Sequence, residues 1–296
     1  MQWRGRRQST NVEDRRGVPG KAVAGGGLGL GGLLLIGVVW LLGGNPQQAA
    51  QIVQRGGGAG GNVVAQGERA GVGEDDAAMD FVQVVLASTE DVWNPLFERE
   101  FPRPYEEPPL VLFAANQRVE TGGCGIAGAG IGPFYCPASR QVFLCPDFFR
   151  QLDEQLGAPG DFAAAYVIAH EVGHHVQNLL GYSDRVNRVR QSGTQADANR
   201  ASVRLELQAD YLAGVWAHHA RRGDRGFIET GDVPEALNAA ARIGDDTLQK
   251  NATGTVNPEG FTHGTSEQRV RWFRAGLETG DLSRLDLFFD APYDRL

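Results

Sequence analysis

Apolar residues follow two different spacings along residues 77–296, and each spacing predicts a type of secondary structure. Apolar positions three and four apart are typical of helices, and this spacing recurs in four segments: 77–97, 161–181, 198–220 and 265–280. Short runs rich in β-branched and aromatic residues are typical of strands, and two occur, at 108–114 and 140–145. The pattern therefore predicts an α+β fold, mostly helical with a small β-sheet.

A different pattern precedes this domain, because residues 22–42 contain no charged side chain over 21 positions. A helix of that length would be about 31 Å long, enough to span the apolar core of a bilayer. The hydrophobic part of a cleaved signal peptide is the alternative, but such segments are about 7–15 residues long. We therefore predict one transmembrane helix. Its small-residue spacing, as at Gly25 and Gly29, is compatible with a homodimer formed through this helix.

The charges around this segment predict its orientation and divide the chain into regions. Residues 1–21 carry six basic and two acidic side chains, which by the positive-inside rule predicts a disordered basic tail in the cytoplasm. Residues 43–76 are rich in Gly and have no amphipathic period, which is typical of a flexible linker. The folded domain, 77–296, is then expected outside the cell, on a single-pass protein of the cell membrane.

Composition narrows the classes of function. The chain has 28 Lys and Arg against 36 Asp and Glu, a formal net charge of −8, which argues against a large basic surface for nucleic acid. Its three Cys residues are too few for a fold that depends on many disulfides.

Cys124 and Cys136 lie twelve residues apart in a Gly-rich loop, and three interpretations compete for them: a disulfide, a metal site or buried free thiols. Because the domain is expected in an oxidising compartment, the disulfide is favoured. Closing a loop of this size would contribute on the order of 3 kcal/mol. Cys145 lies in an apolar run, where a Cys usually behaves as a small buried hydrophobic residue.

The helix expected at 161–181 carries the sequence H-E-x-x-H, from His170 to His174. The two imidazoles are one turn apart, so they project from one face about 5–6 Å apart at Cβ, a separation suited to one tetrahedral zinc ion. Glu171 follows the first His, which would place its carboxylate beside a water on the metal. A pair of core or surface histidines is the alternative, but the apolar helix favours a metal site.

A zinc peptidase site requires a third protein ligand. The helix expected at 198–220 offers Glu206 and Asp210, which lie one turn apart. Two such carboxylates repel, so if both are buried a positive group should lie near them. The simplest assignment makes Glu206 the third ligand of one zinc ion and Asp210 the acceptor of a ring N–H from one of the two histidines. A solvated acidic face is the alternative.

The other histidines are sorted by geometry. His175 is about 100° round the helix from His174, and the pair at 218–219 lies roughly 18–20 Å along the helix from Glu206, so none of these is expected to bind the same metal. His263 precedes a helix in a loop. It would donate to a developing oxyanion if the loop brought it over the zinc, and ordinary loop hydrogen bonds are the alternative.

Over residues 77 to about 289 the chain resembles the bacterial YpfJ-like neutral zinc metallopeptidase family. The segments that carry the resemblance occur in one order: TGGCG, GPFYCP, AYVIAHEVGHHVQ, SVRLELQADYLAGVWA, IGDD and FTHGTSEQRVRWF. The resemblance implies a zincin-like domain that binds zinc through His170, His174 and Glu206. It also implies that Glu171 acts as the base. The Glu-x-x-Ala-Asp pattern is similar to that of HtpX-like and thermolysin-like gluzincins, which supports the role given to Asp210.

Motif, third ligand and resemblance together predict a membrane-anchored zinc metallopeptidase acting on a peptide or protein substrate, with Glu171 and His263 as catalytic residues. The alternative is a non-catalytic, membrane-tethered binding protein that contains zinc for its structure. Structural zinc sites usually have four protein ligands, often Cys, and all three Cys residues precede the expected site helix. An open catalytic site is therefore favoured, although no feature identifies the substrate.

Overall fold

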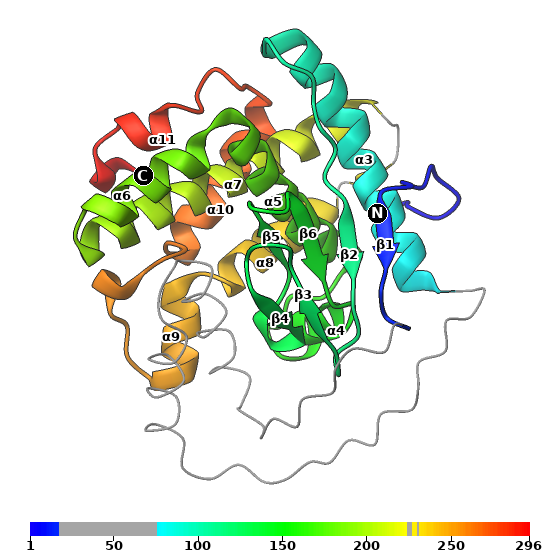
Figure 1. Cartoon of the computed structure of the whole chain (residues 1–296), viewed down its shortest axis with the longest axis horizontal. Coiled ribbons are helices and arrows are strands. Elements are labelled where there is room, and N and C mark those ends of the chain that lie inside the picture. The colour runs from blue at the N-terminus through cyan, green and yellow to red at the C-terminus, as the bar shows by residue number, and fades with distance from the viewer. Residues whose placement is uncertain (18–75, 224–226, 230) are drawn as a thin grey trace, which may run out of the picture.

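The computed structural model describes residues 1–17, 76–223, 227–229 and 231–296 and has helices packed around a small sheet (Figure 1). The strands are β1 (Val12–Asp14), β2 (Leu110–Leu112), β3 (Arg118–Glu120), β4 (Ile126–Gly128), β5 (Phe134–Cys136) and β6 (Gln141–Leu144). The helices are α3 (Ala77–Glu100), α4 (Asp147–Glu154), α5 (Asp161–Leu180), α6 (Tyr182–Ser192), α7 (Gln195–Gly223), α8 (Asp232–Arg242), α9 (Asp245–Thr253), α10 (Ser266–Thr279) and α11 (Leu287–Asp290). The predicted α+β class, mostly helical with a small sheet, is confirmed.

The four-stranded sheet is covered on both faces. Its order is β1-β2-β6-β5; the first three strands are parallel, and β5 runs antiparallel to β6 at one edge. Leu110 and Leu112 belong to the main core with the helices, whereas Val111 and Phe143 belong to a smaller core with the β3–β4 hairpin. Burial of both faces explains why segment 108–114 is continuously apolar rather than alternating. β5 packs against α5, the helix with the H-E-x-x-H motif.

Helices α7 and α10 cross so closely that glycine is required on both. A Cβ at Gly214 of α7 would lie 2.1 Å from the carbonyl oxygen of Phe273. A Cβ at Gly276 of α10 would lie 2.1 Å from the carbonyl oxygen of Tyr211. The crossing holds α7, which carries the acidic site residues, in a fixed position against α10.

We expect Gly214→Ala to lower the free energy of unfolding by at least about 2 kcal/mol, because the added methyl group overlaps backbone atoms that cannot turn aside as a side chain could. Urea unfolding measures the change. Gly128→Ala in β4 is the matched control, since the nearest atom to a Cβ there is 3.7 Å away and the residue is extended. Equal losses in the two variants would contradict the close crossing.

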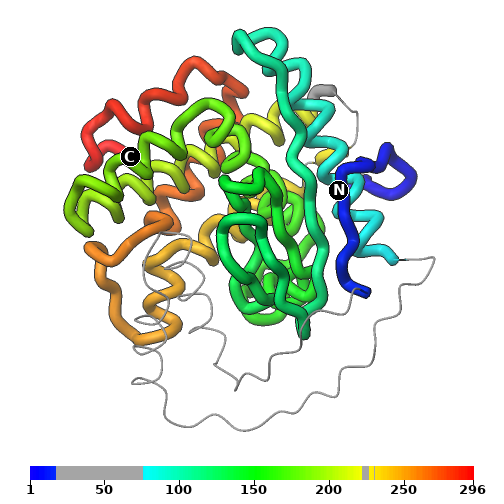
Figure 2. The backbone as a smooth tube through the Cα atoms, viewed as in Figure 1, coloured from blue at the N-terminus to red at the C-terminus, as the bar shows by residue number. Residues whose placement is uncertain are grey.

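Residues 1–17 are part of the folded domain, so the predicted disordered tail over 1–21 is wrong for these residues. Strand β1 pairs with β2, with Val12 opposite Leu110. Figures 1 and 2 show this blue segment lying beside β2 and α3. The sequence predicted a fold that begins at Ala77, but residues 1–17 also belong to it.

Ionic contacts explain why this basic segment is ordered. The α-amino group of Met1 lies 2.9 Å from Oδ1 of Asp232. Arg7 Nη2 lies 2.9 Å from Oε2 of Glu90, a buried carboxylate of α3. The acidic partners are remote in the sequence, so counting charges along the chain does not reveal these ion pairs. The arginines were therefore interpreted as residues that orient the protein in a membrane.

The predicted membrane segment, 22–42, and nearly all of the predicted linker, 43–76, lie outside the residues that the structure describes. Within the described part of the chain, no helix is both long enough and apolar enough to cross a bilayer. The membrane helix and the dimer formed through it therefore stay predictions.

Candidate metal centre

Helix α5 carries the H-E-x-x-H motif through the middle of the core. The backbone N–H of Phe162 in its first turn donates to the Glu235 carboxylate of α8 at 3.1 Å, and Gly181 ends the helix in a left-handed conformation with φ of 86°. Sixteen of its 20 residues are buried, so its polar side chains must find partners within the protein.

The three predicted zinc ligands meet between α5 and α7. His170 Nε2 lies 3.2 Å from Oε2 of Glu206, and His174 Nε2 lies 3.5 Å from its Oε1. One ligand atom from each side chain lies within 4.8 Å of the other two. Donors bound at 2.0–2.1 Å to a tetrahedral zinc lie about 3.3–3.4 Å apart, so the observed separations suit one zinc ion.

The charges in this cluster are suited to a divalent cation. Burial alone would lower the pKa of His170, but the carboxylates of Asp210 and Glu206 outweigh it and raise that pKa to about 9. Burial alone would raise the pKa of Glu206, yet the imidazoles of His174 and His170 hold it well below its usual value. Two carboxylates thus favour positive charge between them, and a bound metal would take the place of protons.

Asp210 lies behind His170, as the sequence analysis proposed, and is fully buried. Its Oδ1 lies 2.9 Å from His170 Nδ1 and also accepts from the Tyr166 hydroxyl at 2.5 Å. The positive group that the sequence analysis required is Arg269 of α10, whose Nε donates to Asp210 Oδ2 at 2.8 Å. Asp210 therefore holds the Nδ1 proton of His170 and leaves Nε2 free for a metal.

His174 is oriented by a different side chain. Its Nδ1 lies 2.8 Å from Oε1 of Gln177, one turn along α5, and Gln177 Nε2 donates to the carbonyl oxygen of Leu205 at 2.6 Å. Gln177 and Tyr166 were not predicted from the sequence, although both lie one turn from a motif histidine, a spacing that could have identified them. Arg269 was not predicted either, because an arginine in an amphipathic helix gives no signal of its partner.

Glu171 lies between the candidate ligands His170 and His174 in the sequence, but it does not belong to the group that could hold the metal. Its side chain is buried and borders the cavity beside His170 and His174. Burial raises its pKa, although the nearby charges of His174 and His170 oppose this. A carboxylate whose pKa is raised toward neutral pH is suited to accept and return a proton.

His263 borders the same cavity from the loop before α10. Its Nδ1 lies 3.0 Å from Oδ1 of Asp245, the first residue of α9, and Oδ2 of Asp245 accepts the backbone N–H groups of Thr262 and His263 at 2.6 Å each. Burial would lower the pKa of His263, but Asp245 outweighs it and raises the pKa. Asp245 belongs to the IGDD segment, to which the sequence analysis assigned no role.

The cavity at this site measures about 190 Å³ and is lined by both polar and apolar side chains. Pro133, Tyr135 and Pro137 border it, alternate residues along the edge strand β5 and its ends. Its apolar wall comes from several elements: Ile131, Phe148, Leu156, Val167, Ile243 and Leu248. A larger cavity of about 580 Å³ lies beside α3, and none of the candidate ligands borders it.

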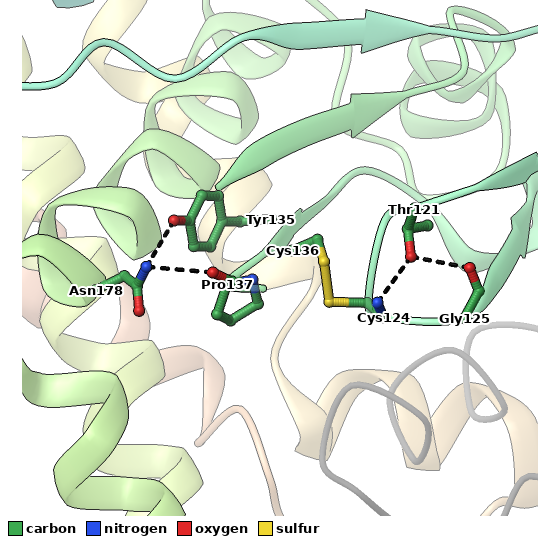
Figure 3. The surroundings of a disulfide bond; sticks show 7 residues. All are labelled: Thr121, Cys124, Gly125, Tyr135, Cys136, Pro137 and Asn178. Atoms are coloured by element: carbon green, nitrogen blue, oxygen red, sulfur yellow. Dashed lines mark hydrogen bonds between the residues drawn. A yellow bond between two sulfur atoms is a disulfide. The ribbon is translucent and has the colours of Figure 1, made fainter. Parts of the chain in front are cut away.

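Cys124 and Cys136 form a disulfide, with their Cα atoms 5.9 Å apart (Figure 3). It ties the Gly-rich loop to the end of β5, next to Tyr135 and Pro137 at the cavity. Asn178 of α5 donates to the Tyr135 hydroxyl at 3.0 Å, so the same strand is also held to the site helix. Cys145 is buried, and burial raises the pKa of its thiol to about 12.

The remaining histidines lie away from the ligands. His175 has Nδ1 at 3.0 Å from the Tyr135 hydroxyl, and its Nε2 lies 2.5 Å from the carbonyl oxygen of Glu106. Burial lowers the pKa of His175 to about 4, so it is neutral at pH 7. His218 contacts the carbonyl oxygen of Leu277.

Comparison with known proteins identifies related sequences but no related solved structure. Residues 1–288 match the family described as "Putative neutral zinc metallopeptidase". The "Uncharacterized protein YpfJ" of Escherichia coli (strain K12) is 45% identical over 295 residues, which cover 97% of this chain and 99% of that protein. The "Uncharacterized protein Rv2575" of Mycobacterium tuberculosis is 42% identical over 221 residues, covering 70% and 71%. No solved structure matches the chain, so the zincin-like fold stays a prediction.

Proposed function

The chain belongs to this family of neutral zinc metallopeptidases, and from that premise we propose that it hydrolyses peptide bonds with zinc held by His170, His174 and Glu206. One observation carries the proposal: ligand atoms of three side chains converge within 4.8 Å, beside a carboxylate that is not a ligand. Three protein ligands leave one position of a tetrahedral ion open, as catalytic zinc sites do, whereas structural sites usually have four.

The zinc ion and the residues around its ligands would each have a separate role in the reaction. When bound, zinc would polarise the scissile carbonyl and make a water more acidic. Glu171 would accept the proton of the attacking water and return it to the leaving amine. His263, positioned by Asp245, would donate to the carbonyl oxygen as that oxygen gains negative charge.

The edge strand supports a peptide as the substrate. Among the described residues, β5 has a neighbour in its sheet on one side only, and Tyr135 within it and Pro133 and Pro137 at its ends border the cavity. An extended peptide can bind to such an edge through backbone hydrogen bonds.

We also propose that residues 22–42 attach the enzyme to the cell membrane, with the domain on its outer side. The 21 uncharged residues support attachment. The disulfide between Cys124 and Cys136 supports an oxidising compartment.

Removal of the metal tests the enzymatic proposal. We expect the full chain, purified in detergent, to contain about one zinc and to hydrolyse members of a broad fluorogenic peptide library. A chelator should abolish hydrolysis and added zinc should restore it, whereas Glu206→Gln should bind little zinc and remain inactive. Glu278→Gln, an exposed carboxylate on α10, is the control. Full zinc content without hydrolysis of any library member would favour the zinc-containing binding protein instead.

A further inference from the structure

Arg190 of α6 borders the cavity of the candidate metal centre, and its charge lacks an acidic partner. Among the described residues, no carboxylate lies within ion-pair distance of it, although the charge of Glu206 acts on it from further away. Its Nη2 donates to Ser202 Oγ at 3.1 Å, while its Nε is buried and has no hydrogen-bond partner in the described part of the chain. The guanidinium is half-buried, and leaving its shielded N–H without an acceptor is costly, which makes it a site for an incoming anion.

The surroundings of Arg190 suit a peptide. Four residues on one face of α6 border the cavity: Ser183, Val186, Asn187 and Arg190. The apolar residues that border the same cavity include Phe148 and Leu248. The cavity therefore combines space for an apolar side chain with the charge of Arg190, whereas the other arginine that borders it, Arg269, is paired with Asp210.

We propose that Arg190 binds a carboxylate of the substrate, so that the enzyme prefers peptides with a carboxylate close to the bond that is cleaved. A carboxylate is the anion that a peptide offers, and it pairs with a guanidinium through charge-assisted hydrogen bonds. The group would be either the C-terminal carboxylate or an Asp or Glu side chain. This inference rests on the proposed function, because it concerns the substrate of the same site.

Peptide binding tests the inference without requiring turnover. The probes are four fluorescein-labelled pools of apolar hexapeptides, ending in a carboxylate or a carboxamide and carrying Glu or Gln at a central position. Dissociation constants are measured on the Glu171→Gln chain, loaded with zinc, with and without Arg190→Met. We expect Arg190→Met to weaken binding of the pools with a C-terminal carboxylate, or of the pools with a central Glu, by roughly 10- to 100-fold. Binding of the pool with a carboxamide end and a central Gln should stay nearly unchanged.

Two controls separate this role from a structural one. Arg188→Met removes an exposed arginine of the same helix and should change no affinity, and Arg190→Lys should keep part of the preference for carboxylates. Loss of affinity for acidic and neutral pools alike, or no preference before the substitution, would overturn the inference. Selective binding by Arg190 with no hydrolysis by the wild type would instead overturn the proposed function alone.

A second inference rests on a different observation, the docking of residues 1–17 on the domain. Arginines that a charge count assigns to membrane orientation form ion pairs within the fold. Arg16 contacts Asp76 at 2.5 Å and Arg7 contacts Glu90 at 2.9 Å, and both acidic residues belong to 76–296. These contacts accompany the pairing of β1 with β2.

A helix that crosses a bilayer once places its two flanks on opposite sides of about 30 Å of hydrocarbon, whereas paired strands are about 4.8 Å apart. We infer that residues 1–17 and 76–296 lie on the same side of any membrane to which the protein is attached. The single-pass topology predicted from the sequence, with a cytoplasmic N-terminus and an extracytoplasmic domain, is incompatible with this pairing. The inference therefore replaces that topology, and keeps the proposed attachment through residues 22–42 and the outer position of the domain.

Labelling with a membrane-impermeant maleimide tests this arrangement in intact cells expressing the full chain. Thr10→Cys reports on the N-terminal segment and Glu154→Cys on the domain, since both positions are exposed. We expect the two variants to be labelled equally before lysis, relative to their labelling after lysis. Labelling of only one of them in intact cells would overturn the inference.

Discussion

Glu171→Gln is expected to lower kcat for peptide hydrolysis by roughly 10²- to 10⁴-fold while zinc stays bound at about one ion per chain. The amide has nearly the size of the carboxylate and replaces none of the ligands, but it cannot accept a proton from the attacking water. Zinc content and kcat, measured on the same preparation, separate the two effects.

His174→Ala provides the contrasting result, because it removes a ligand and should therefore lose zinc and hydrolysis together. The exposed Glu267→Gln, at the start of α10, should change neither. Hydrolysis retained by Glu171→Gln would refute the assignment of this residue as the base, even if zinc is present.

Long, strongly periodic segments could be predicted from the sequence. The helix expected at 161–181 corresponds to α5, Asp161–Leu180, because a helix with an extensive apolar surface and a glycine at its end leaves a clear pattern. Strands β3 and β4 have three residues each, too few to produce a period, and were not predicted. The short strand β1 was not predicted for the same reason, and also because its partner β2 lies almost a hundred residues away in the chain.

The site residues that lie close together in the sequence could be predicted from it. His170, Glu171 and His174 lie within five residues, and the i to i+4 spacing of Glu206 and Asp210 places both on one helix face. The groups that hold them come from elsewhere in the fold. Arg269 is one of several arginines in an amphipathic segment, and only the packing of α10 against α7 distinguishes it from a solvated side chain.

Arg269→Met is expected to lower the free energy of unfolding by about 3–5 kcal/mol, because it leaves the fully buried Asp210 without its neutralising charge. Urea unfolding measures the loss, and zinc affinity should fall about 10- to 100-fold because His170 loses its fixed orientation. The double variant Arg269→Met, Asp210→Asn removes both charges and should recover part of the stability. Arg274→Met, exposed on the same helix, serves as the control. A double variant as unstable as the sum of its two single variants would mean that the two charges are not coupled.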